Sequence, residues 1–159
     1  MKLHFFNVKN GAYEAKENKK LCMEELCKKC KGSDGDAKKF IKSYYTQHGY
    51  HVIDNPTYAR INNMGYILRC QFLRNFGVSK KQFMADLDSK GRPDFLVYND
   101  KENFFVVASS LRMVSAYTLK WVFSKSYPSK IVIQDTQSVI KEKILFHPRF
   151  QINRILRPR

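Results

Sequence analysis

Two short apolar runs near the middle of the chain constrain its fold more than any other feature. Phe95–Tyr98 and Phe104–Ala108 contain only apolar and aromatic residues, and the charged turn 99–103 separates them. Such runs predict β-strands, and a strand without polar positions has to be buried on both of its faces. The sequence therefore predicts an inner hairpin of a sheet that carries helices on both sides.

Apolar residues at helical spacing predict helices before and after the hairpin. The clearest stripe runs from Ala37 to Tyr45, and His48-Gly49 ends that helix. The expected elements, in chain order, are a helix at 37–48, a strand at 50–53, a mostly helical insertion at about 57–90, strands at 95–98 and 104–108, a helix at 114–122 and a strand at 131–133. This order predicts a three-layer α/β domain with a mixed central sheet flanked by helices.

The two ends of the chain are expected to lie outside this core, which would span residues 31–142. Residues 1–30 are predicted to form a helical extension, because 12–30 is rich in Lys and Glu with Leu and Met interspersed. Residues 143–159 follow the last acidic residue, Glu142, and are predicted to form a basic C-terminal arm.

The charge of the chain points to a polyanionic partner. Lys and Arg number 29 against 14 Asp and Glu, which gives a formal net charge of +15. Such a charge opposes compaction unless a polyanion neutralises it, so nucleic acid is the expected partner and an anionic membrane surface is the weaker alternative. No apolar run reaches the length of a membrane span, and residues 1–13 lack the order of a signal peptide. We therefore expect an intracellular protein.

The hairpin also carries part of a pattern used in phosphodiester cleavage. That reaction needs carboxylates that hold Mg²⁺ against the phosphate, and usually a lysine near the attacking water. A hairpin supplies these groups when an acid opens one strand and an acid and a lysine, two residues apart, share a face of the next. Pro93-Asp94 opens the first strand in this way.

With these residues the segment from Gly91 through the hairpin resembles the PD-(D/E)xK nuclease superfamily. The residues Lys31-Gly32-Ser33-Asp34-Gly35-Asp36, the amphipathic helix and the strand after it are similar to the start of archaeal Holliday-junction resolvases. The resemblance covers about residues 31–135, interrupted by the insertion at 57–90. It implies a restriction-endonuclease-like fold in which Asp36 and Asp94 would be the Mg²⁺ ligands.

The chain departs from this family where the chemistry depends on it most. Val107 and Ser109 stand where the resemblance implies an acid and a lysine, which implies a catalytically degenerate site. Lys120 on the following helix could replace the lysine in an active enzyme, or it could be a surface residue. Asp94 could equally be a turn residue that leads into a strand, and Asp36 a helix N-cap.

Basic clusters are the candidate contacts to nucleic acid, because Lys and Arg hold phosphates without a metal. The candidates are Lys28, Lys29, Lys31, Lys38, Lys39, Lys42, Lys80, Lys81, Arg92, Arg149, Arg154, Arg157 and Arg159. Tyr58 and Tyr66 could stack on unpaired bases, with packing in the core as the alternative.

The four cysteines are a weak indication of a metal site. Only Cys27 and Cys30 have CxxC spacing, so a zinc site that also used Cys22 and Cys70 is the minor interpretation. Packing of Cys22 and Cys30 within a helix is favoured. We expect no cofactor, apart from Mg²⁺ if the chain is an active nuclease.

Together these features predict a protein that binds RNA or DNA on a degenerate nuclease-like domain. Its expected role is structural, with other proteins, in a nucleoprotein assembly such as an organellar ribosome. The alternative is an active Mg²⁺-dependent endonuclease on branched or structured DNA, with Asp36, Asp94 and Lys120 at its site. A protein–protein adaptor is a third hypothesis, for which the sequence offers no motif.

Overall fold

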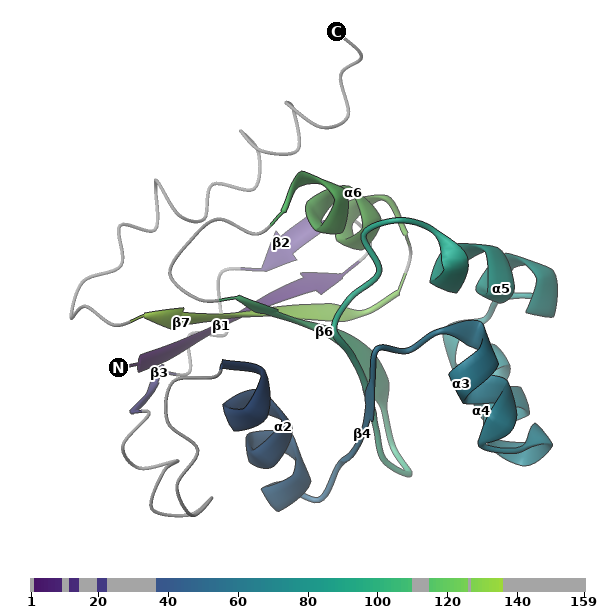
Figure 1. Cartoon of the computed structure of the whole chain (residues 1–159), viewed down its shortest axis with the longest axis horizontal. Coiled ribbons are helices and arrows are strands. Elements are labelled where there is room, and N and C mark those ends of the chain that lie inside the picture. Colours follow the sequence, from purple (N-terminus) through teal and green to yellow (C-terminus); the bar gives the residue numbers. More distant parts are fainter. Residues whose placement is uncertain are drawn as a thin grey trace, which may run out of the picture.

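The structure, a computed structural model, describes residues 2–9, 12–14, 20–22, 37–109, 115–125 and 127–135, which form a mixed β-sheet with helices on both faces (Figure 1). The strands are β1 (Lys2–Lys9), β2 (Ala12–Glu14), β3 (Lys20–Cys22), β4 (His51–Asp54), β5 (Phe95–Tyr98), β6 (Asn103–Ser109) and β7 (Ser129–Asp135). The helices are α2 (Ala37–Gln47), α3 (Tyr58–Asn63), α4 (Tyr66–Phe76), α5 (Lys80–Asp88) and α6 (Ala116–Ser124).

The sheet follows the order β2-β1-β7-β6-β5-β4, and β3 pairs with β1 beside this path. β4, β5 and β6 form an antiparallel meander. The chain then crosses through α6 to β7, which runs parallel to β6, and β1 pairs antiparallel with β7. The predicted mixed sheet is confirmed, as is the predicted order of helices and strands between residues 37 and 133.

The central hairpin forms as the two apolar runs predict. Phe95 pairs with Val106 and Tyr98 with Asn103, so the turn between the strands is short. The side-chain oxygen of Asn99 closes this turn by accepting hydrogen bonds from the backbone N–H groups of Lys101 and Glu102, at 2.8 and 2.9 Å. The turn fixes the register, and the register fixes which side chains of β6 face which layer of helices.

Each face of the sheet has its own apolar core. On one face Phe40 and Ile41 of α2 pack with Phe95, Val97 and other strand residues. On the other face α6 and the helices α3 to α5 pack against a separate cluster of alternate strand residues, which includes Leu96 and Phe105. Successive residues of a strand point to opposite faces, so one apolar run supplies both cores. Helices therefore cover both faces, consistent with the three layers that the sequence predicts.

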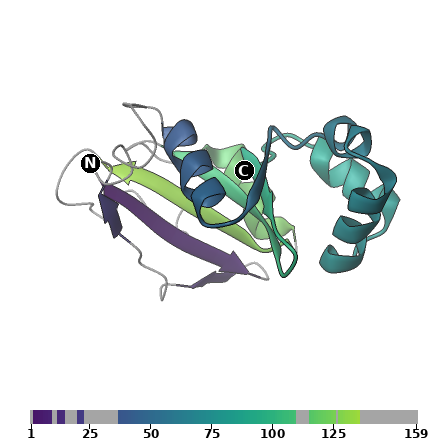
Figure 2. The same ribbon diagram turned by 90° about the horizontal axis from the view of Figure 1, so that it is seen from below.

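The predicted helical insertion is confirmed as α3, α4 and α5, which lie together beside the β4 side of the sheet in both views (Figures 1 and 2). Aromatic side chains join these helices to the sheet. Phe76 of α4 stacks on Phe105 of β6, with ring centroids 5.4 Å apart, and makes an edge contact with Tyr127 at 5.1 Å. The insertion is thus part of the hydrophobic core.

A buried carboxylate also ties the insertion to α6. Asp86 of α5 is only 4 % exposed. Its Oδ2 accepts a hydrogen bond from the hydroxyl of Tyr127 at 2.6 Å, and its Oδ1 accepts one from the amide of Gln82 at 2.8 Å and lies 3.1 Å from Nζ of Lys125. The indole N–H of Trp121 donates to the backbone oxygen of Asp86 at 2.8 Å. A buried charge with this many partners is compensated, and it fixes α5 against α6.

The prediction for the N-terminal segment is wrong in its described part. Residues 12–14 and 20–22 are the short strands β2 and β3, not a surface helix, and both pair with β1. β1 itself lies inside the sheet next to β7, and Phe5 and Phe6 enter the two opposite cores. Pairing with a neighbouring strand overrides the helical propensity of Lys- and Glu-rich sequence. Residues 23–30 of the predicted helix and the predicted arm at 143–159 lie outside the described residues.

Candidate nucleic-acid interface

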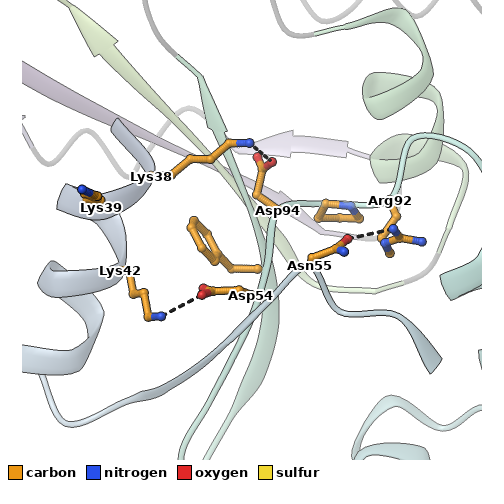
Figure 3. A pocket seen from close by; sticks show the side chains of 9 residues that line it. Lys38, Lys39, Lys42, Asp54, Asn55, Arg92 and Asp94 are labelled. Carbon is orange, nitrogen blue, oxygen red and sulfur yellow. Dashed lines mark hydrogen bonds and ion pairs between the residues drawn. The ribbon is translucent and has the colours of Figure 1, made fainter. Parts of the chain in front are cut away.

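A basic pocket opens where the N-terminal half of α2 meets the start of β5 (Figure 3). Its volume is about 470 Å³. The residues that line it are Lys38, Lys39, Lys42, Asp54, Asn55, Arg92, Pro93, Asp94 and Phe95. Five of them were candidates from the sequence, namely Lys38, Lys39, Lys42, Arg92 and Asp94, and the fold brings these distant segments together. Four cationic and two anionic side chains give the pocket a formal charge of +2.

Asp94 lies at the centre of this arrangement. Its carboxylate Oδ1 lies 3.2 Å from Nζ of Lys38, and its Oδ2 accepts a hydrogen bond from the backbone N–H of Ala108 at 2.7 Å. Its own carbonyl accepts from the backbone N–H of Asn55 at 2.9 Å. Asp94 therefore joins the ends of three segments, namely α2, β4 and β6, while a quarter of its side chain stays exposed.

A second carboxylate, Asp54, lines the same pocket, and sequence reasoning missed it. Its Oδ2 accepts a hydrogen bond from Nζ of Lys42 at 2.7 Å, and its Oδ1 is buried without a hydrogen-bond partner among the residues that the structure describes. Asp54 is the last residue of β4, which is antiparallel to β5. An acidic residue at the end of the strand next to β5 was the sequence feature that could have identified it.

Arg92 is held in a defined orientation beside the two carboxylates. Its Nη1 donates to the carbonyl of Leu87 at 2.8 Å, and its Nη2 donates to the side-chain oxygen of Asn55 at 2.8 Å. Asn55 adopts a left-handed backbone conformation with φ of 45°, which asparagine tolerates better than most residues. The guanidinium is thus positioned by α5 and by the turn after β4.

The residues of β6 beside Asp94 provide neither an acid nor a lysine. The hairpin register, continued by one residue, sets Val107 opposite Asp94. The Val107 side chain is 3 % exposed and packs in the core on the α6 face, whereas the Asp94 carboxylate contacts Lys38 of α2. Ser109 pairs through its backbone with Ile133, and its side chain is outside the described residues.

The other two predicted catalytic residues do not add to the described site. Lys120 lies on the exposed side of α6, which packs on the sheet face opposite α2, and it does not line the pocket. Asp36 lies outside the described residues.

Of the remaining basic candidates, Lys80 and Lys81 are exposed at the start of α5. Those outside the described residues are Lys28, Lys29, Lys31, Arg149, Arg154, Arg157 and Arg159.

The two tyrosine candidates differ in their surroundings. Tyr58 packs edge-on against Phe83, with ring centroids 6.5 Å apart, and its hydroxyl is buried, so the core-packing alternative describes it. Tyr66 is 70 % exposed, and the guanidinium of Arg69 lies over its ring at 5.2 Å from the centroid. Tyr66 is therefore the exposed one of the two, and Tyr58 is half-buried.

The cysteines are distributed over separate parts of the chain. Cys22 belongs to β3, Cys70 is half-buried in α4, and Cys27 and Cys30 lie outside the described residues. A hydrogen bond with the thiol of Cys70 raises the pKa of the Tyr66 hydroxyl. Within the described part of the chain, no three His, Cys, Asp or Glu side chains gather in a way that could hold a metal ion.

The fold and this site together define an α/β domain with a mixed sheet and a basic pocket at one end of its central hairpin. No protein family, curated protein or solved structure matches the chain. In the regions that the structure describes, no helix is long and apolar enough to cross a membrane.

Proposed function

We propose that this chain binds nucleic acid on a nuclease-like scaffold that no longer cleaves it. The observation that carries the proposal is the pocket at the start of the hairpin, which Lys38, Lys39, Lys42 and Arg92 line together with Asp54 and Asp94. Phosphate groups are bound by lysine and arginine side chains, and this binding does not require a metal. The formal charge of +15 over the whole chain favours the same partner.

The arrangement of elements supports a nuclease-like scaffold. Helix α2, the meander of β4, β5 and β6, helix α6 and strand β7 follow one another in the order that the resemblance to PD-(D/E)xK nucleases implies. Asp94 opens the hairpin of β5 and β6, and the hairpin contacts α2 through the ion pair with Lys38. These features support a restriction-endonuclease-like fold.

The groups at the pocket argue against efficient cleavage. Val107, which lies opposite Asp94 in the hairpin register, has no carboxylate. Its side chain packs in the core on the α6 face of the sheet. The loss of a charge-stabilising lysine alone is expected to raise the barrier to cleavage by about 2–4 kcal/mol. A structural role in a nucleoprotein assembly, such as an organellar ribosome, accords with a site that binds without cutting.

One observation favours a second function, that of a Mg²⁺-dependent endonuclease. Two carboxylates, Asp54 and Asp94, line the same pocket, and Oδ1 of Asp54 is buried without a partner in the described region. Carboxylate oxygens are the protein ligands that Mg²⁺ prefers. In this alternative the two aspartates would hold the metal, and the substrate would be branched or structured DNA.

Two measurements on the purified chain test these proposals. Binding of labelled RNA and DNA, followed by fluorescence anisotropy across a salt series, is expected to weaken steeply as salt rises. Binding that does not change with salt, or no binding, would refute nucleic-acid binding through phosphates. Incubation of branched DNA with Mg²⁺ or Mn²⁺ is expected to leave it intact, whereas cleavage that is lost in Asp94→Ala would establish the endonuclease instead.

A further inference from the structure

The ion pair between Asp94 and Lys38 bears on which ligand the basic pocket takes. A carboxylate that holds Mg²⁺ must turn an oxygen toward the metal. In this pocket Oδ1 of Asp94 is already paired with the Lys38 ammonium, and Oδ2 accepts the hydrogen bond from the backbone N–H of Ala108. The side chain of Lys38 thus supplies the positive charge that a metal ion would otherwise supply (Figure 3).

The second carboxylate of the pocket, Asp54, is paired with an ammonium group through Oδ2, while its Oδ1 has no hydrogen-bond partner in the described region. Lys38 and Lys42 are four residues apart on α2 and so share one side of the helix. Lys42 reaches Asp54 at 2.7 Å, as Lys38 reaches Asp94, and both pairs are partly exposed to solvent. The two ion pairs hold two ammonium groups at the pocket where a divalent cation would need both carboxylates.

Further cationic groups at the pocket are positioned to receive an anion. A guanidinium has five N–H donors, and Arg92 uses Nη1 on Leu87 and Nη2 on Asn55, which fixes its plane. Lys39 is exposed on α2 and lines the same pocket. An oxyanion at this point would meet a positioned guanidinium together with ammonium groups, and both kinds of group bind phosphate.

We propose that the pocket seats a phosphodiester group of a nucleic-acid backbone without a divalent cation. Lys39, Lys42 and Arg92 contact the phosphate, and Lys38 takes the place of the metal at Asp94. This inference rests on the proposed nucleic-acid-binding function and assigns that function to one site. In a nuclease the aspartates would attract a metal ion. Here they orient the lysines, and their negative charge weakens binding of the phosphate.

Removing the charge of an aspartate should strengthen RNA binding if the pocket holds a phosphate directly, and weaken it if the pocket holds a metal ion. Asp94→Asn keeps an oxygen that can accept from Ala108 and removes the negative charge, and Asp54→Asn does the same beside Lys42. Both variants are expected to bind a labelled RNA about two- to fivefold more tightly than the unmodified chain at low salt, the range set by partly exposed charge pairs. Lys42→Gln and Arg92→Gln are expected to bind it about threefold to tenfold more weakly. The ratio of each variant's affinity to that of the unmodified chain should be the same with Mg²⁺ as with EDTA, because Mg²⁺ held by the RNA weakens the binding of every variant alike.

The β5–β6 turn provides matched controls. Asp100→Asn and Lys101→Gln make the same charge changes at exposed positions outside the pocket, and they are expected to leave the affinity unchanged. Circular dichroism of each variant checks that it has folded. Asp54→Asn serves as an independent test if Asp94→Asn does not fold.

The results of these binding measurements distinguish failure of the inference from failure of the proposed function. If the unmodified chain binds no nucleic acid, the proposed function fails and the inference fails with it. If the chain binds but the pocket variants behave like the turn controls, only the inference is overturned. Weaker binding by Asp94→Asn in Mg²⁺ but not in EDTA would mean that a metal occupies the pocket. Displacement of RNA by inorganic phosphate, where chloride of equal ionic strength has no effect, would identify free phosphate as the ligand.

Discussion

The hydroxyl of Tyr127 donates a hydrogen bond to the buried carboxylate of Asp86 at 2.6 Å, and this contact joins the helical insertion to the segment that leads into β7. The same carboxylate also holds Gln82 and Lys125. Removal of one partner from such a group leaves others unsatisfied, so these residues contribute as a unit.

Asp86→Ala should therefore be strongly destabilising. It leaves the Tyr127 hydroxyl buried without its acceptor and removes the charge partner of Lys125, and a loss of about 3–5 kcal/mol in the free energy of unfolding is expected. Asp88→Ala, at an exposed position of the same helix, is the control and should change the stability by no more than about 0.5 kcal/mol. Urea denaturation of the two variants measures both values. Equal effects would contradict the role given to Asp86.

The stability of the chain should fall at alkaline pH in a way that depends on Tyr127. Burial, followed by the hydrogen bond to Asp86, raises the pKa of the Tyr127 hydroxyl in the folded protein. The folded state therefore keeps this proton to a higher pH than the unfolded chain does. The stabilisation is complete below about pH 10, the ordinary value for tyrosine, and is lost as the pH rises above it. Thermal unfolding of Tyr127→Phe between pH 8 and pH 11 should show a shallower decline than the unmodified chain. Parallel declines would show that Tyr127 contributes nothing to it.

Gly91→Ala should be far more costly than alanine at another glycine of similar conformation. Gly91 has φ of +93°, and an added Cβ would lie 2.2 Å from the backbone oxygen of Tyr117 at the start of α6. Gly49 has φ of +85° with no atom within 4 Å of such a Cβ. We expect a loss of about 1 kcal/mol for Gly49→Ala, from backbone conformation alone, and at least about 3 kcal/mol for Gly91→Ala. Chemical denaturation compares the two, and similar losses would contradict the close approach of the loop to α6.

Val107→Glu tests the orientation of β6. In the structure this side chain lies in the core on the α6 face, so a carboxylate there would be buried without a partner. A loss of at least about 3 kcal/mol is expected, with no gain of nuclease activity in Mg²⁺. Val107→Ile, which stays apolar and adds a single methylene, should cost less, about 1–2 kcal/mol. A stable Val107→Glu variant that bound Mg²⁺ would show that position 107 faces Asp94.

The sequence predicted the fold best where the spacing of apolar residues fitted one kind of secondary structure. The stripe from Ala37 to Tyr45 fits only a helix with one buried side, and the two apolar runs fit only inner strands, so α2, β5 and β6 were predictable. The short strands β2 and β3 were not predictable, because three residues are too few to show an alternating strand pattern of their own. They become strands only through β1, which is a tertiary effect.

The candidate site was predicted in its composition but not in its pairing. Asp94, Arg92 and the lysines of α2 were identified from local motifs, whereas Asp54 was interpreted only as the point where a strand stops. The pairing of Asp94 with Lys38 depends on how α2 crosses the end of the hairpin. No local pattern fixes that crossing, because it follows from how the apolar stripe packs on the sheet.

The position of β1 has a consequence for biogenesis. Val8 pairs with Ser129 and Lys2 with Asp135, so the beginning of the chain completes a sheet whose neighbouring strand is synthesised far later. Contacts between such remote segments form slowly, and they cannot form on the ribosome until β7 has emerged. Before then β1, with Phe5 and Phe6 near its centre, has no partner on the β7 side. A strand with an unpaired edge readily joins other chains. A nascent chain in which β1 has emerged and β7 has not should therefore be the species most prone to aggregation.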